Sequence, residues 1–383
     1  MSILKGGKIV SKLTIQNERV IFKFQEHLRV KNKGYSEATI NRVIRSIRYY
    51  QEFTKNTDFR NFNSTKALKF SQFLKSETDY GKSLSLSTID SYLRDLRMFF
   101  SWLSEQPGYK SKIIKTDIEH FGLSRRELNI SNNEKPKVIP SLDYAHQLTG
   151  FIEIKTEVDM RDQALIAFTI LTGMRDHAII TLPLGCIDED NLIIRQDPDL
   201  GVHTKFGKYI LSLIFKFDDK LVSYVLDWIK FLREKGFNDN DPVFPKALRK
   251  QDSNNLSFGL ADKVSNKFLT DTGIIRSIFK IRAETANLKY YPPHSFRHLH
   301  DQLVLKYCKN GEQIKAASQH LGHKSPSTTI SVYGKYAPNQ LVEILKDINN
   351  NIEEAKGFEE QQVTVPCLLT KNPWIKLPQK KCQ

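Results

Sequence analysis

Apolar residues recur at helical spacing in the first third of the chain. The first such stretch covers residues 17–33, where four residues would share one helical face: Val20, Ile21, Phe24 and Leu28. Gly34 would end that helix. Two later segments resemble each other, SEATINRVIRSIRYY from Ser36 and SLSTIDSYLRDLRMF from Ser85, and both open with side chains suited to capping a helix. The pattern therefore predicts a further helix in each.

A shorter apolar pattern over residues 64–75 predicts another helix between those two. Together these make about four helices, which we expect to form one domain over residues 15–106, after an N-terminal segment of residues 1–14. The two similar helices carry arginines at matching offsets, which are the candidate DNA-binding residues: Arg45, Arg48, Arg94 and Arg97. A charged helix face that is merely solvated is the ordinary alternative.

The periodicity fades over residues 107–140, and the polar, proline-containing stretch SNNEKPKVIP predicts an interdomain linker there. A second domain is expected over residues 141–356. It begins with a buried helix, RDQALIAFTIL, followed by two strands, NLIIRQD and KYILSLIF, with GVHTKFG between them as a hairpin. Helices should then resume at Asp219, and residues 357–383 form a tail. The expected fold class is mainly α with a small antiparallel β-sheet.

The charge balance points to a polyanionic partner. Lys and Arg number 58 against 43 Asp and Glu, a formal net charge of +15, and such a surplus favours binding to nucleic-acid phosphates. The four cysteines show neither metal-ligand spacing nor a disulfide framework. No signal peptide or apolar span long enough for a membrane is present. We therefore expect a cytoplasmic protein that needs no membrane, metal or cofactor.

Three short motifs carry candidate chemistry. The first is TGMR, which ends at Arg175. The second is HSFRH, in which His294 and Arg297 lie one helical turn apart. The third is LGH, which ends at His323 and is followed by Tyr333. Each motif alone is more often a surface, ion-pair or packing feature, so the indication comes from the ordered set.

Attack on a phosphodiester gathers negative charge on the non-bridging oxygens, and two arginine forks can hold those oxygens without a metal. Arg175, Arg297, His294 and His323 would form that phosphate pocket. Tyr333 would be the nucleophile. A general acid for the leaving oxygen would come from the predicted hairpin. Lys205 is the candidate for that role, with Lys208 as the alternative.

These motifs resemble those of the tyrosine recombinases, or phage-type integrases, over about residues 15–355. The resemblance implies a two-domain DNA clamp, made of a helical core-binding domain and a mixed α+β catalytic domain. It implies six catalytic residues: Arg175, Lys205, His294, Arg297, His323 and Tyr333. It also implies a 3′-phosphotyrosyl intermediate, a Holliday junction and a homo-tetramer on double-stranded DNA with paired recombination sites.

Several features depart from the fullest family pattern. Asp176 and His177 follow Arg175, where family members often carry a small residue and then a glutamate. Tyr336 lies close enough to Tyr333 to be the alternative nucleophile. Only about 16 residues precede the first helix, so we expect simple core sites and no separate arm-binding domain. Residues 338–355 are amphipathic and would dock on a neighbouring protomer or cover their own core, and we favour docking.

Two other function classes compete with this interpretation. A metal-dependent nuclease would use a histidine-rich region: His294, His298, His300, His320 and His323. No cluster of acidic residues accompanies these histidines, and that reading leaves the arginines unexplained. The other class is a catalytically inactive, sequence-specific DNA-binding factor. Within the recombinase reading the sequence favours integration, excision or transposition of a mobile element over dimer resolution, and it identifies neither the target site nor accessory proteins.

Overall fold

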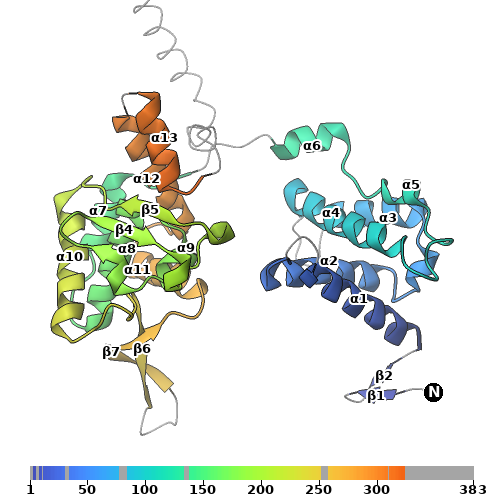
Figure 1. The fold of residues 1–383 in the computed structure, drawn as a ribbon, viewed down its shortest axis with the longest axis horizontal. Helices are drawn as coiled ribbons and strands as arrows, with labels where there is room; N and C mark the ends of the chain where they lie inside the picture. Colours follow the sequence, from blue (N-terminus) through green and yellow to red (C-terminus); the bar gives the residue numbers. More distant parts are fainter. Residues whose placement is uncertain are drawn as a thin grey trace, which may run out of the picture. The chain divides into compact units, whose positions relative to one another are not determined.

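The computed structural model (Figure 1) describes residues 3–5, 8–10, 12–30, 34–76, 84–132, 138–251, 258–308 and 310–323. The chain divides into two compact units, residues 1–134 and residues 135–383. Each unit has its own hydrophobic core. No helix in the described ranges has the length and apolar character needed to cross a membrane. The predicted fold class, mainly helical with small antiparallel sheets, is confirmed.

The first unit contains the predicted helices in chain order: α1 (Lys12–Val30), α2 (Glu37–Phe53), α3 (Ser64–Lys75) and α4 (Leu86–Leu103). Ser36 and Ser85 cap α2 and α4, and their hydroxyl oxygens accept hydrogen bonds from the main-chain N–H groups of Thr39 and Thr88. A short antiparallel hairpin of β1 (Ile3–Lys5) and β2 (Lys8–Val10) precedes α1. Helices α2 and α4 pack against each other. Their shared contact includes the buried Asp95, which accepts hydrogen bonds from Arg42 and Ser46.

The first unit extends beyond the predicted boundary at residue 106. Five residues past that point are buried in its core: Tyr109, Ile113, Ile118, Phe121 and Leu123. This stretch holds only the one-turn helix α5 (Lys115–Ile118), and α6 (Arg125–Asn132) follows it and packs against α4. Because the apolar residues lie in turns and in one short helix, they show no helical period, and the segment was predicted to be a linker.

The second unit is built around α8 (Glu157–Thr172), in which every residue from Arg161 onward is buried. The helices that pack on α8 are α7 (Leu142–Gly150), α10 (Asp219–Glu234) and α12 (Pro293–Tyr307) (Figure 1). Two further helices complete this part of the unit, α11 (Gly273–Thr285) and α13 (Gly311–His320), and the short α9 (Asp176–Ile180) follows α8.

The predicted hairpin is present within a three-stranded antiparallel sheet. Its strands are β3 (Ile187–Asp188), β4 (Ile193–Gln196) and β5 (Ile210–Leu213), and Ile194 is opposite Ser212. A second hairpin was not predicted. It consists of β6 (Pro245–Gln251) and β7 (Phe258–Phe268) and interrupts the helical run expected after Asp219. Its sequence is rich in charged and polar residues and poor in β-branched ones, so it lacks a strand pattern.

Candidate active site

The TGMR motif forms the end of the buried helix α8. Gly173 adopts the left-handed conformation (φ 57°), and a Cβ atom there would lie 2.5 Å from Cδ2 of His300. The last carbonyls of the helix find partners elsewhere in the fold. Phe215 N–H donates to Leu171 O at 3.0 Å, and His300 Nδ1 lies 2.8 Å from Ile170 O. The motif therefore needs glycine for its backbone angle and for its contact with His300.

Arg175 and Arg297 meet at one main-chain oxygen. Arg175 Nη1 donates to Leu321 O at 3.2 Å, and Arg297 Nη2 donates to the same oxygen at 2.8 Å. Arg297 Nη1 also donates to Gly173 O. Burial, followed by the charge of Arg175, lowers the pKa of Arg297 to about 10. Both side chains stay cationic near neutral pH, and their donors are held by carbonyl oxygens.

His323 joins this pair through Arg297. Its Nε2 lies 3.1 Å from Arg297 Nη2, so the guanidinium donates and the imidazole nitrogen accepts. Burial, and then the charges of Arg297 and Arg175, lower the pKa of His323 to about 4. Gly322 (φ 62°) turns the chain out of α13, and a Cβ atom there would lie 2.4 Å from Cδ1 of Ile210. The LGH motif thus holds a neutral imidazole beside the arginines.

His294 occupies the exposed first turn of α12, one turn before Arg297. Its ring packs edge-on against His298, with 4.6 Å between the ring centres. His298 in turn lies close enough to His323 to contribute to the lowering of its pKa. His294 therefore lies on the same side of α12 as His298, at the solvent-exposed end of the site. The contact between His294 and His298 was not predicted.

The two candidate lysines lie in the connection between β4 and β5. Lys205 is exposed, and its Nζ lies 5.2 Å from the ring centre of Phe206. Lys208 lines a hollow of about 490 Å³ together with Gln319 and His323. Neither lysine forms an ion pair with a described residue. The choice between the two lysines stays open. Tyr333, Tyr336, the segment 338–355 and the tail lie outside the described residues.

Two acidic residues influence the arginines: Asp301, which was not predicted, and Asp176, which was noted only as a departure from the family pattern. Asp301 is 2% exposed and lies one turn after Arg297 on α12. Its charge acts to raise the pKa of both Arg175 and Arg297, and Asp176 acts in the same direction on Arg297. Spacing within HSFRHLHD was the signal available, because residues four apart share a helix face. Within the described ranges, no three His, Cys, Asp or Glu side chains converge as metal ligands would.

The candidate DNA-binding arginines of the first unit differ in their surroundings. Arg45 and Arg48 line a hollow of about 590 Å³ with Tyr49 and Tyr92. Arg48 lies 3.5 Å from a carboxylate oxygen of Glu18, and Arg94 lies 3.1 Å from one of Asp90. Arg45 is exposed and Arg97 half-exposed, and neither has an ion pair among the described residues.

Comparison with known proteins places these features in context. The family model described as "Phage integrase family" matches residues 142–340. Tyrosine recombinase XerD of Oceanobacillus iheyensis is 24% identical over 318 residues, which cover 82% of this chain and 92% of the relative. The Tn1549 transposon integrase bound to transposon right end DNA is 15% identical, with a TM-score of 0.55 over 86% of this chain and 98% of that chain. A lambda integrase tetramer bound to a Holliday junction is 12% identical, with a TM-score of 0.54 over 87% and 84%.

Proposed function

Because this chain belongs to the phage integrase family and is a site-specific DNA recombinase, we propose that Tyr333 is the nucleophile that cleaves the DNA backbone. The observation that carries the proposal is the convergence of Arg175 and Arg297 on Leu321 O, with His323 beside them. Two cations held this close repel each other, and a phosphate oxygen that accepts from both would relieve that repulsion.

The proposed step is a transesterification. Tyr333 Oη forms a bond to phosphorus while the bond from phosphorus to the 5′ oxygen breaks, which leaves a 3′-phosphotyrosine. The phenolic proton passes to solvent or to a pocket histidine, and the 5′ oxygen takes up a proton and leaves as a hydroxyl. Lys205, or Lys208 in its place, would supply that proton. Attack by a 5′ hydroxyl of the partner strand reverses the chemistry and produces a Holliday junction.

The forks of Arg175 and Arg297 would hold the non-bridging oxygens as their charge grows in the transition state. His323 would turn its ring toward the same oxygens, and the phosphate charge would oppose the lowering of its pKa by the two arginines. His294, at the exposed start of α12, would complete the pocket from the solvent side.

We propose that the enzyme acts as a homo-tetramer on two copies of its DNA site and serves a mobile element. Support comes from the likeness of fold to a lambda integrase tetramer bound to a Holliday junction and to a transposon integrase. An apolar hollow of about 480 Å³ lies between β5, α12 and α13. Residues 338–355, which follow α13 in the chain, would dock in that hollow on a neighbouring protomer.

In the first unit, we propose that Arg45 contacts DNA phosphates directly. It is exposed, it lines the hollow between α2 and its neighbours, and no described carboxylate pairs with it. Arg97 would act in the same way from α4. Arg48 and Arg94 would first have to exchange their carboxylate partners for phosphate.

The test is formation of a covalent protein–DNA adduct. Nicked duplexes carrying candidate element-end sequences are incubated with the full chain in EDTA and resolved on denaturing gels. We expect an adduct that is lost in Tyr333→Phe and Arg297→Ala but kept in Tyr336→Phe. Loss only in Tyr336→Phe would move the nucleophile. Specific binding without an adduct from any variant would identify an inactive DNA-binding factor instead.

A further inference from the structure

Two buried imidazoles lie behind the arginines and take no part in the proposed chemistry. His300 on α12 is 0% exposed, and His320 at the end of α13 is 8% exposed. Their rings are stacked with 5.1 Å between centres, and Phe215 packs edge-on against both. Buried polar groups are almost always hydrogen-bonded, so each ring nitrogen should have an identifiable partner.

The partners fix the position of every proton. Leu213 N–H lies 3.1 Å from His320 Nδ1, and because a main-chain N–H only donates, that nitrogen carries no proton. The proton of His320 is then on Nε2, which lies 3.0 Å from His300 Nε2. His300 Nε2 must accept, so the proton of His300 is on Nδ1, and it is donated to Ile170 O at 2.8 Å. All the hydrogen bonds are satisfied when both rings are neutral.

An additional proton on either ring would disrupt this series of hydrogen bonds. On His320 it would face the Leu213 N–H, and on His300 it would face the proton of His320. The ionisable groups facing the pair are Arg297 and His323, and the charge of Arg297 disfavours a second cation. The other groups that face the pair do not ionise. At the end of α8 they are Ile170, the main chain of Thr172 (a further hydrogen-bond partner of His320) and Gly173. On the other side they are Leu213 of β5 and, just after it, Phe215 and Phe217. Burial lowers the pKa of both rings, that of His320 to about 3.

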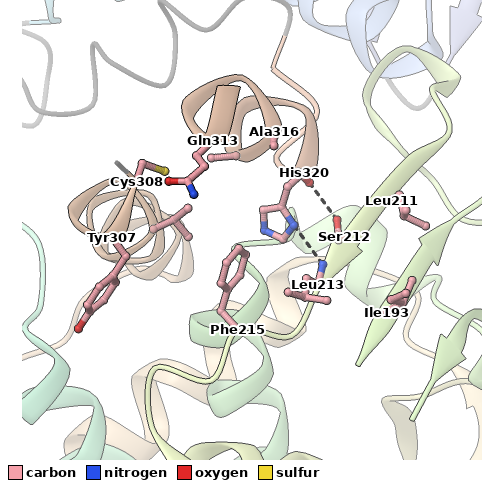
Figure 2. A pocket seen from close by; sticks show the side chains of 12 residues that line it. Ile193, Leu211, Ser212, Leu213, Phe215, Tyr307, Cys308, Gln313, Ala316 and His320 are labelled. Carbon is pink, nitrogen blue, oxygen red and sulfur yellow. Dashed lines mark hydrogen bonds between the residues drawn. The ribbon is translucent and has the colours of Figure 1, made fainter. Parts of the chain in front are cut away.

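The pair connects the two carbonyl groups that hold the arginines. Figure 2 shows the ring of His320 directed from α13 toward β5, where it accepts from Leu213 N–H while its own carbonyl accepts from Ser212 Oγ at 2.9 Å. The next carbonyl, Leu321 O, is the shared acceptor of both guanidinium groups. At the other end, His300 binds Ile170 O and packs against Gly173, whose oxygen accepts from Arg297.

We infer that His300 and His320 are positioning residues for DNA strand cleavage: as a neutral, hydrogen-bonded pair they hold the Gly173 and Leu321 carbonyls that orient Arg297 and Arg175. Both rings are buried, so they act through the arginines and not on the DNA itself. A hydrophobic pair of similar size would fill the space but would leave the Leu213 N–H and the Ile170 carbonyl without these partners. The inference rests on the proposed phosphate-binding role of the two arginines.

The protonation pattern can be measured without any reaction. In the full chain labelled with ¹⁵N-histidine, long-range ¹H–¹⁵N spectra report which ring nitrogens carry protons. We expect His300 to carry its proton on Nδ1 and His320 on Nε2, unchanged between about pH 5.5 and pH 8. A ring protonated on both nitrogens in this range, or the opposite tautomers, would overturn the inference. This measurement uses the wild type and so does not depend on a variant that folds.

The effect on cleavage is measured as the rate of adduct formation at saturating nicked DNA, per folded molecule. His320→Asn retains a side-chain oxygen that can accept from Leu213 N–H but loses the link to His300. We expect its rate to fall about 10- to 100-fold, because small displacements of catalytic groups have effects of that size. Its Kd for the DNA should change by less than about threefold, because the phosphate-contacting surface is retained. The exposed His120→Asn serves as the matched control.

The outcomes separate the inference from the proposed function. A wild type that forms no adduct contradicts the proposed function. A wild type that forms the adduct, with His320→Asn equally fast, overturns the positioning role. His300→Gln provides a further check, since its effect should be smaller in the His320→Asn background, where the link is already broken. Independent, additive losses would also count against a coupled pair.

Discussion

Arg297 is held by main-chain oxygens, where most buried arginines would pair with a carboxylate. Gly173 O and Leu321 O accept from the two ends of its fork, and the side chain is only 4% exposed. A carboxylate bonded to both nitrogens would neutralise the charge, whereas carbonyl oxygens fix the orientation and leave the charge available. Asp301, one turn further along the same face of α12, offsets part of the charge. This arrangement suits the phosphate-binding role proposed for the arginines.

Replacing Arg297 with lysine keeps the positive charge but removes the fork. One ammonium group cannot bind Gly173 O, Leu321 O and a phosphate in the same geometry. We expect Arg297→Lys to lower the rate of adduct formation about 100-fold or more, by analogy with the loss of one preorganised donor to a developing oxyanion. The measurement is single-turnover cleavage of the nicked duplex.

The control for that variant is Arg233→Lys on α10, where the guanidinium pairs with Asp239 at the surface. It should cleave at the wild-type rate. An Arg297→Lys variant within about threefold of wild type would mean that charge alone suffices at this position.

Only part of the site can be read from the sequence at this scale. The motifs single out Arg175, Arg297 and His323, and the structure brings these three together, while their catalytic roles stay a prediction. The acceptor that the two arginines share, Leu321 O, is a main-chain oxygen, which no residue type reveals. His300 and His320 were visible only as members of a histidine-rich region, because the contact between them joins two helices. Because histidine is a common metal ligand, the sequence suggested a metal site, whereas the hydrogen bond between the two rings indicates a neutral pair.

At the scale of elements, the prediction succeeded where a period and a cap coincided. Helices α2 and α4 have apolar residues at helical spacing and a serine that caps the first turn. Strands β4 and β5 were predicted from their apolar runs, and both alternate in burial, although in β5 the buried positions include Ser212 while Leu211 and Leu213 are exposed. The hairpin of β6 and β7 has no such alternation, so its pairing depends on the surrounding structure. Residues 107–132 were predicted to belong to a linker for a related reason: their buried apolar residues lie mostly in turns, and turns show no helical period.

The close contact between Gly322, at the end of α13, and Ile210 of β5 can be tested by mutation. We expect Gly322→Ala to destabilise the second unit by more than the roughly 1–2 kcal/mol that a left-handed alanine costs. The excess arises because the new Cβ would lie 2.4 Å from Ile210 Cδ1 on β5. The measurement is the free energy of unfolding in denaturant.

A matched control separates backbone strain from the clash. Gly207 has nearly the same φ (59°), and its Cβ would meet nothing within 4 Å, so Gly207→Ala should show the strain alone. Adding Ile210→Val to Gly322→Ala removes the clashing Cδ1 atom and should recover part of the lost stability. Equal losses in the two alanine variants, with no recovery by valine, would contradict this account.

At the scale of the whole molecule, the two units have separate cores with no shared residue. Trp102 packs against the core of the first unit, and Trp228 is buried in the core of the second. Unfolding of the unit that holds the arginines can therefore be followed through Trp228 in a Trp102→Phe, Trp374→Phe background. This gives access to the thermodynamics of the site without DNA.

The buried histidine pair should make the stability of the second unit depend on pH. The folded pKa values of His300 and His320 lie below the ordinary value of 6.5, so the unfolded chain binds more protons at mildly acidic pH. The free energy of unfolding should therefore rise with pH, and it should be lost progressively as the pH falls from about 6.5 toward the folded values. Near pH 5 each histidine contributes a slope of about 1.4 kcal/mol per pH unit. In His320→Asn, the slope of the free energy of unfolding against pH, followed through Trp228, should fall by the contribution of one proton, about 1.4 kcal/mol per pH unit. The exposed His120→Asn should leave this slope unchanged. An undiminished slope in His320→Asn would mean that this imidazole takes up no proton on unfolding and is already charged in the fold.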